Sequence, residues 1–265
     1  MTFSGPWWIP ALVGLVGGIF SGLVGVGGGF VMIPLMTGIL RFRQHDAHGT
    51  SLFIIIPTAT AAGIGYAIRG EIRWDIVAAL AATAIVFAAL GARLTQHINA
   101  VALRRMFAVL LVATAVRMFI ALDGAAITHP QGAMLIVSAL VAGVVTGLIS
   151  GTMGVGGGIV MVPAMVLFMA IDQRVAQGIS LAVIIPTAVS GAIQHYRLGH
   201  IRVRLGLLIM IGAVAGAAIG AELAHWLPEA ALRVVFGIVA IYAAQRMFGI
   251  QSWVMRRLRP ANATQ

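Results

Sequence analysis

The sequence predicts an all-α polytopic membrane protein built from two copies of one helical unit. The chain of 265 residues is 60% hydrophobic and 9% charged, with a mean hydropathy of +1.03, whereas soluble domains are about half apolar and a quarter charged. A ten-residue segment occurs twice, as GVGGGFVMIP at 25–34 and as GVGGGIVMVP at 154–163. Unsatisfied backbone groups are costly in hydrocarbon, so these long, non-alternating apolar runs are expected to be helices.

The two copies keep a constant offset of 129 residues, which carries Gly25 onto Gly154. The offset holds without a gap in the pairs Ser21/Ser150, Gly49/Gly178, Ser51/Ser180, Pro57/Pro186, Thr58/Thr187, Gly70/Gly199, Gly91/Gly220, Arg104/Arg233, Phe107/Phe236 and Arg117/Arg246. A duplicated unit places the first membrane repeat at 1–125 and the second at 126–252, followed by a basic cytoplasmic tail at 253–265. Transporters built from two halves commonly hold substrate between them, on helices broken near the bilayer midplane.

Each repeat contains five apolar segments, at 7–24, 28–40, 48–68, 75–96 and 101–122, and again at 133–153, 157–170, 177–196, 204–226 and 230–250. The second segment of each repeat is shorter than the roughly 20 residues that a membrane span requires. We therefore expect a half-helix of a re-entrant or short hairpin with GVGGG at its apex, followed by about three transmembrane helices. Whether the first two segments fully cross the membrane is left open.

The third segments carry Pro57 and Pro186 in their middle. A proline inside a helix removes one backbone hydrogen bond and frees the carbonyl four residues earlier, here those of Phe53 and Ala182. These two helices are therefore predicted to kink at membrane depth.

The arginines favour an inverted arrangement of the repeats. The formal net charge is +10 and all 17 basic residues are arginines. If each hairpin returns to its own side, the second repeat is inverted, and twelve arginines fall on one side against five on the other. A parallel arrangement would split them seven against ten. The positive-inside rule therefore predicts inverted repeats with both termini in the cytoplasm.

Several function classes are not supported by the composition. Without cysteine, the chain has no disulfides and no thiolate metal sites. No basic region precedes the first apolar run, so a cleaved signal peptide is not expected. Nucleic-acid binding is not expected, because it needs a water-exposed basic surface that this chain lacks. No His, Glu or Asp constellation has metal-ligand spacing, and no nucleophile lies beside a base, so we predict no metal, no cofactor, no catalytic residue and no enzymatic activity.

The glycine runs are the leading candidates for a binding site. Glycines allow positive φ and bring backbone N–H groups close to a ligand, and the half-helix that follows points its positive end at the apex. An anion could be held there without a buried basic side chain. The alternative is that these glycines only permit tight helix packing. Duplication in one register favours a substrate-lining break formed by Gly25, Gly27, Gly28 and Gly29 and by Gly154, Gly156, Gly157 and Gly158.

Hydroxyl groups at matched positions complete the candidate site. Ser21 and Ser150 precede the glycine runs by one turn, and the proline segments contribute Ser51, Pro57, Thr58, Ser180, Pro186 and Thr187. Such hydroxyls often bond a carbonyl of their own helix instead. With backbone amides, they would bind an oxyanion while keeping the charge low enough for release.

Most ionisable residues mark segment ends. Loop or cap roles are expected for Asp46, Glu71, Asp75, Asp123, Asp172 and Glu229. Glu222 corresponds to Arg93 and is predicted to be interfacial, with a proton or gate role as the alternative. His48 and His195 lie near the third segments, where packing or interfacial roles are favoured over proton coupling.

The doubled GxGGGxxxxP motif, with the S-L-x-x-I-x-P-T segments at 51–58 and 180–187, resembles the TauE/SafE family of sulfite and organosulfonate exporters. The likeness covers nearly the whole chain. It implies an inner-membrane transporter, exporting sulfur-containing or other small organic anions, without choosing among sulfite, thiosulfate, sulfoacetate and a non-sulfur carboxylate.

Two other classes remain open. A channel or carrier for another small solute or a cation is the nearer one, and a membrane enzyme or assembly factor is more distant. A cation site would be expected to show an acidic residue in the middle of a segment, and none is evident. The expected partners are a small anionic substrate and the lipid bilayer, with a homodimer left open.

Overall fold

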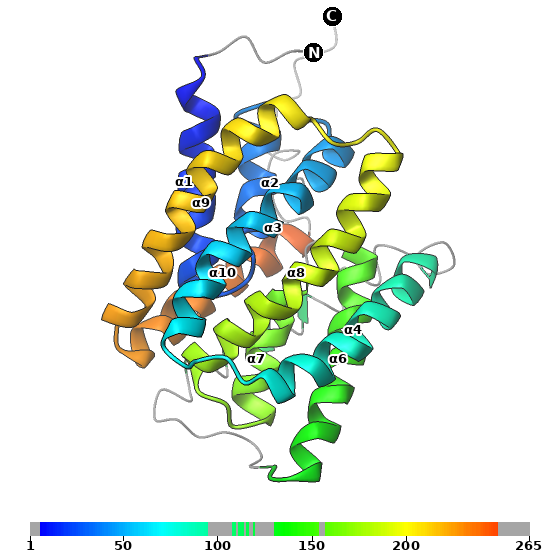
Figure 1. Cartoon of the computed structure of the whole chain (residues 1–265), viewed down its shortest axis with the longest axis vertical. Helices are drawn as coiled ribbons and strands as arrows, with labels where there is room; N and C mark the ends of the chain where they lie inside the picture. Colours follow the sequence, from blue (N-terminus) through cyan, green and yellow to red (C-terminus); the bar gives the residue numbers. More distant parts are fainter. Residues whose placement is uncertain are drawn as a thin grey trace, which may run out of the picture.

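The computed structural model describes residues 6–94, 108–109, 111–113, 115–116, 119, 130–153 and 157–248. Every regular element in these residues is a helix (Figure 1). The helices are α1 (Trp8–Val24), α2 (Gly29–Gly38), α3 (Gln44–Ile68), α4 (Trp74–Leu94), α6 (Ala133–Met153), α7 (Gly158–Phe168), α8 (Gln173–Arg197), α9 (Val203–Trp226) and α10 (Glu229–Phe248). The predicted segment at 101–122 lies largely outside the described residues, and the tail at 253–265 lies wholly outside them.

Helix length and hydropathy agree with the predicted membrane protein. Three helices, α3, α8 and α9, are long and apolar enough to cross a membrane. By contrast, α2 has 10 residues and α7 has 11, and a rise of 1.5 Å per residue makes them about half of a membrane span. The expectation that the second segment of each repeat is a short helix is confirmed. Both α3 and α8 begin four residues before the predicted apolar segments, because their first turns are polar.

The repeat offset extends to the helix boundaries. Shifting α3 by 129 residues gives the bounds of α8, and the start of α4 falls on the start of α9. The contacts between repeats are matched as well, since α1 packs on α9, α4 packs on α6, and α3 packs on α8. The first helix of each repeat therefore lies against the fourth helix of the other repeat.

Helices α3 and α8 pack side by side in opposite directions. Gly49, near the start of α3, packs against His195 at the end of α8. Gly178, near the start of α8, packs against Tyr66 at the end of α3. This antiparallel pair lies at the centre of the structure, and Pro57 and Pro186 lie inside its two helices.

Glycine seams join the outer helices. A methyl group placed on Gly14 of α1 would come within 1.9 Å of the Ile209 carbonyl oxygen of α9. On the other side of the same seam, a methyl group on Gly212 would come within 1.9 Å of the Ala11 carbonyl oxygen. Gly143 of α6 packs on α4 in the equivalent way. These glycines let two backbones touch, which is the packing role known from membrane helices.

The buried apolar side chains form two clusters. The larger spans both repeats and contains the fully buried side chains of Tyr66, Leu80, Met161 and Phe236. The smaller contains Met32 and Met36 of α2 and packs between α1, α3 and α9. One face of the half-helix α2 is thus buried against α1, α3 and α9.

Candidate functional site

The first glycine run forms a turn that breaks the chain between α1 and α2. Gly25, Gly27 and Gly28 have φ values of +70°, +76° and +70°, a region that side chains with a Cβ rarely adopt. In the second run Gly157 has a φ of +72°. Gly154 and Gly156 lie outside the described residues. The chain therefore enters α2 and α7 through left-handed glycines at matched positions, Gly28 and Gly157.

The N-termini of α2 and α7 have no side-chain caps. Glycine occupies the capping position of both helices, and no side chain donates or accepts a capping hydrogen bond there. The Gly28 carbonyl accepts from the amides of Val31 and Met32, and the Gly157 carbonyl accepts from the corresponding amides of α7. The earlier amides of each first turn are those that helix geometry leaves for an outside acceptor.

Two serines flank each of these N-termini. A methyl group on Gly29, the first residue of α2, would lie 3.0 Å from Ser51 Oγ, and one on Gly28 would lie 2.9 Å from Ser21 Cβ. The second repeat has the same arrangement, with Ser180 Oγ beside Gly158 and Ser150 beside Gly157. The structure therefore places four of the candidate hydroxyl residues at the glycine turns.

Three of these serines are buried without a hydrogen-bond partner. Within the described residues, Ser21 Oγ, Ser51 Oγ and Ser180 Oγ have no partner, and their residues are 0%, 1% and 0% exposed. Buried polar groups in folded proteins are normally hydrogen-bonded. The free hydroxyls lie next to unsatisfied helix N-termini, so both kinds of donor are available to the same ligand.

The first glycine turn touches the first residue of α7. A methyl group on Gly158 would lie 3.0 Å from the Val26 Cα, and one on Gly27 would lie 3.2 Å from Ile184 of α8 and 3.4 Å from Ile55 of α3. Ile55 and Ile184 are themselves a repeat-related pair. The first glycine turn thus lies against Ile55 of α3 and Ile184 of α8 and contacts the start of α7.

The two candidate threonines bond within their own helices. The Thr58 hydroxyl donates to the Ile54 carbonyl at 2.7 Å, and the Thr187 hydroxyl lies 2.9 Å from the Ile184 carbonyl. Each of these hydroxyls still has lone pairs to offer, but its proton is engaged. The serines are therefore the stronger donors for an anion.

A polar network beside the first glycine turn was missed in the sequence. The Tyr66 hydroxyl lies 2.9 Å from both the Gly22 carbonyl and Gln177 Oε1, between which its proton is shared. Gln177 Nε2 donates to the Leu23 carbonyl at 3.1 Å, and Gly25 packs against the Gln177 side chain. The only indication of this network in the sequence was an amide side chain within an apolar segment. The network links α1 to α3 and α8.

Most of the ionisable residues form ion pairs near helix ends. Glu222, near the end of α9, pairs with Arg69 through both carboxylate oxygens, at 2.7 and 2.8 Å. The other ion pairs among the described residues are Asp46 with Arg202, Asp75 with Arg73, and Glu229 with Arg233, and Glu71 contacts His225. Asp172 is the N-cap residue of α8, and Asp123 lies outside the described residues.

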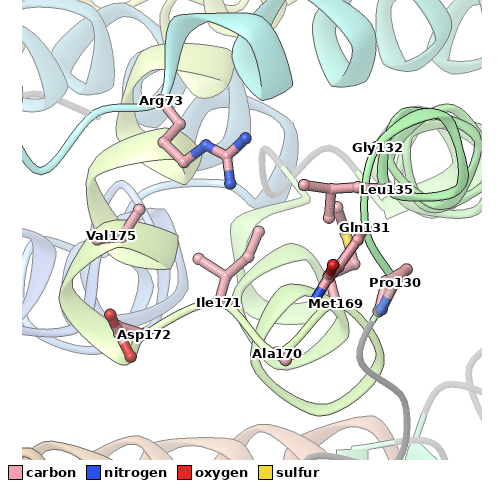
Figure 2. Close-up of a pocket in the computed structure, with 10 residues that line it drawn as sticks. All are labelled: Arg73, Pro130, Gln131, Gly132, Leu135, Met169, Ala170, Ile171, Asp172 and Val175. Carbon is pink, nitrogen blue, oxygen red and sulfur yellow. The ribbon is translucent and has the colours of Figure 1, made fainter.

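Repeat-related crevices open at the outer ends of the two hairpins. Figure 2 shows one of about 470 Å³, where the Arg73 side chain extends toward Ile171 and Gln131. Its counterpart, of about 70 Å³, has Arg202 at the position of Arg73 and Arg43 at that of Asp172. Each hairpin therefore has an arginine from the other repeat beside its outer end.

Long apolar helices, outward-facing aliphatic side chains such as Ile211 (69% exposed) and Ile238 (58% exposed), and short broken helices define a helical membrane protein. The sequence model of the Sulfite exporter TauE/SafE family matches residues 2–118 and 139–264. The chain belongs to this family.

Curated relatives share nearly its full length. The chain is 28% identical over 220 residues to the probable membrane transporter protein YdhB of Bacillus subtilis, covering 82% of this chain and 89% of that protein. It is 25% identical over 250 residues to a probable membrane transporter protein of Methanocaldococcus jannaschii, covering 87% and 92%. A probable membrane transporter protein of Haemophilus influenzae is 27% identical over 263 residues, covering 89% and 96%.

Proposed function

We propose that this protein transports small anions across the cell inner membrane, with sulfur oxyanions and organosulfonates such as sulfite and sulfoacetate as substrates and export as the direction. The description of the family, sulfite exporter, supports this substrate class and direction. The observation that carries the proposal is the set of buried, unpartnered serine hydroxyls beside the uncapped N-termini of α2 and α7.

The chemistry of this site favours an anion over a cation. Hydroxyl and amide protons are donors, and the N-terminus of a helix carries partial positive charge. None of the nearest neighbours of Gly25, Gly27, Gly28, Gly29, Gly157 and Gly158 is a carboxylate. A cation would need such a group, or a cluster of free carbonyl oxygens, in a low-dielectric site.

Inverted repeats give this site two-sided access. Support comes from the antiparallel packing of α3 on α8, and in Figure 1 α3 runs downward from its blue end while α8 runs upward to its yellow end. A repeat pair related in this way brings its two hairpins from opposite faces to a shared midplane. Anion passage would then alternate between the outer ends of the two hairpins.

The cytoplasmic face is assigned by arginines. Arg41, Arg43 and Arg202 line one crevice, while its counterpart is lined by Arg73 together with Asp172. Under the positive-inside rule the first crevice faces the cytoplasm, which places both chain termini on that side.

The test is flux of defined anions into liposomes containing the purified full chain. We expect saturable flux of sulfite or sulfoacetate, competition between the two, and no flux of sodium or potassium. The wild-type protein should bind sulfite, and the double variant Ser51→Ala/Ser180→Ala should bind sulfite more weakly. Cation flux without anion flux would contradict the proposal, and so would anion flux that both serine substitutions leave unchanged.

A further inference from the structure

The two ends of the α3–α8 pair are related by the repeat but carry different polar residues. At one end, where α3 starts and α8 finishes, lie His45, His195 and His200. The positions related to them by the offset of 129 residues hold Arg174, Tyr66 and Glu71 at the other end. The backbone arrangement is shared, so the difference in behaviour between the ends must come from these side chains.

The three imidazoles form a contiguous cluster drawn from three places in the chain. The His45 ring of α3 stacks on the His200 ring of the α8–α9 connection, with centroids 5.5 Å apart. The His195 ring of α8 lies 5.6 Å from His200. Within the described residues, the Nδ1 atoms of His195 and His200 are buried without a hydrogen-bond partner. No hydrogen bond in this cluster therefore fixes either ring as neutral or charged.

The surroundings of the cluster offer no free counter-charge. Asp46, the nearest carboxylate on α3, is engaged by Arg202 through two hydrogen bonds of 2.8 and 3.0 Å. Arg41 and Arg43 line the same crevice as this ion pair. The other titratable or charged groups on the described part of the adjoining segments are His48, Tyr196, Arg197 and Arg204. A second proton on the cluster would be repelled by the first, because the ring centroids lie only 5.5 and 5.6 Å apart.

The opposite end is held by complementary groups instead. Glu71 lies 2.6 Å from His225 of α9, and Arg174 donates to the carbonyls of Ala224 and Leu227 at the end of that helix. Protonation of His225 would strengthen its contact with a carboxylate, whereas protonation of the three clustered imidazoles would drive α3 and α8 apart. Acidification thus acts on the two ends in opposite directions.

We propose that His45, His195 and His200 form a proton-binding gate that opens the α3 start and α8 end of the transport pathway in acid, while the Glu71–His225 end stays closed. The proposal rests on the proposed transport function, to which it adds proton coupling. Opening separates the rings and admits water, which makes protonation less costly in the open state, so a lower pH favours that state.

Single cysteines can report each end, because the chain contains none of its own. Ser51→Cys places a reporter on α3 near the histidine end, and Ser180→Cys places one on α8 near the opposite end. Each is labelled in the liposome-embedded full chain with a water-soluble thiol reagent at about pH 5.5 and about pH 8, on either side of the usual histidine range. The same labelling is repeated in a His195→Gln/His200→Asn background. The pH dependence of the thiol reaction is the same in both backgrounds, so the ratio of the two labelling rates reports the histidines alone.

We expect acid to raise labelling at Ser51→Cys by about tenfold relative to the histidine-free background, as like-charge repulsion across a few ångströms predicts. Labelling at Ser180→Cys should not rise. Arg43→Gln is the matched control, because it removes a charge at the same end that does not titrate, and it should keep the acid response. His45→Gln changes an exposed side chain and should weaken the response without a folding defect.

Equal acid responses in the wild-type and histidine-free backgrounds would overturn the proposal, as would equal responses at the two reporters. Because labelling requires no substrate, it separates this inference from the proposed function. Absence of anion flux at every pH, with the labelling difference intact, would refute the transport proposal and leave the proton-binding gate standing. Flux that is present but unaffected by the histidine substitutions would refute the gate alone.

Discussion

Val26 and Gly158 lie in contact although they belong to different repeats. A methyl group on Gly158 would come within 3.0 Å of the Val26 Cα, so the tip of the first glycine turn rests on the first residue of the second half-helix. Gly158 has no room for an added methyl group at this point.

The left-handed glycines should tolerate substitution in a graded order. A methyl group on Gly28 would lie 2.7 Å from the Gly17 carbonyl oxygen, whereas one on Gly157 has no neighbour closer than 3.1 Å and one on Gly38 has none within 4 Å. A Cβ in the left-handed region costs roughly 1–2 kcal/mol before any clash. We expect anion flux to fall most in Gly28→Ala, less in Gly157→Ala and not in Gly38→Ala.

The bulkier variants Gly28→Val and Gly157→Val should remain in the membrane but lose flux, because a β-branched side chain fills the space above the half-helix N-terminus. Membrane content is measured alongside flux by blotting. Normal flux in both valine variants would leave tight packing as the better explanation of the glycine runs.

Removing the buried serine hydroxyls should weaken binding without weakening the fold. Ser51 Oγ and Ser180 Oγ have no partner within the described residues, so alanine breaks no internal hydrogen bond. Loss of one hydrogen bond to an anion should lower its affinity about fivefold to thirtyfold. Thermal melting with and without sulfite measures both quantities. A drop in the melting temperature without ligand would assign the serines to structure.

Thr60→Val serves as the control for the serines. The Thr60 hydroxyl donates only to the Ile56 carbonyl of its own helix, at 2.8 Å. This variant should keep the sulfite-induced shift in melting temperature. A loss as large as that of Ser51→Ala would mean that any hydroxyl change on α3 disturbs binding.

The helix prolines are predicted to act as hinges. Pro57 and Pro186 lie inside α3 and α8, where each removes a backbone hydrogen bond and leaves a weak point. Alanine would restore that bond and favour one access state, and a bias of only about 1.4 kcal/mol changes a population ratio tenfold. Flux should therefore fall more than equilibrium anion affinity in Pro57→Ala and Pro186→Ala. Equal losses of both would place the prolines in the binding site, and unchanged flux would make them structural only.

Tyr66→Phe should loosen the first glycine turn. The lost hydroxyl leaves Gln177 Oε1 buried without its present donor, at a cost of about 1–3 kcal/mol for an unsatisfied buried group. We expect a lower melting temperature, which the double variant Tyr66→Phe/Gln177→Leu should partly recover. An unchanged melting temperature in Tyr66→Phe would show that the hydroxyl holds nothing in place.

The seam glycines should behave differently from the glycines of the turns. Gly14→Ala would push a methyl group to within 1.9 Å of a backbone oxygen of α9, and neither backbone can yield without separating the helices. Gly14→Ala should fail to fold and should no longer elute as a single species in detergent. Gly28→Ala should still fold and elute as a single species. Normal yield of Gly14→Ala would mean that α1 and α9 pack less closely than described.

The spacing of residues in the sequence predicts much of the fold. The duplicated GVGGG segments, the short runs after them and the long third segments predicted where α2, α7, α3 and α8 would lie, because apolar run length sets helix length in a membrane. The candidate serines could be named for the same reason, since a constant offset marks them twice. Gln177 and Tyr66 were missed, because a single amide or phenol within an apolar run carries no periodic signal.

The tertiary structure alone showed which glycines outside the duplicated runs form a seam, since the sequence does not give their partners. Gly14 faces a carbonyl of α9 from within α1, whereas Gly28 has a φ of +70° and faces the hairpin's own first helix with Ser21. It also decided which hydroxyls are free, because Thr58 bonds its own helix and Ser51 does not. Local sequence fixes helix length and the position of breaks, but contacts between repeats depend on how distant helices meet, and only folding brings Val26 to Gly158.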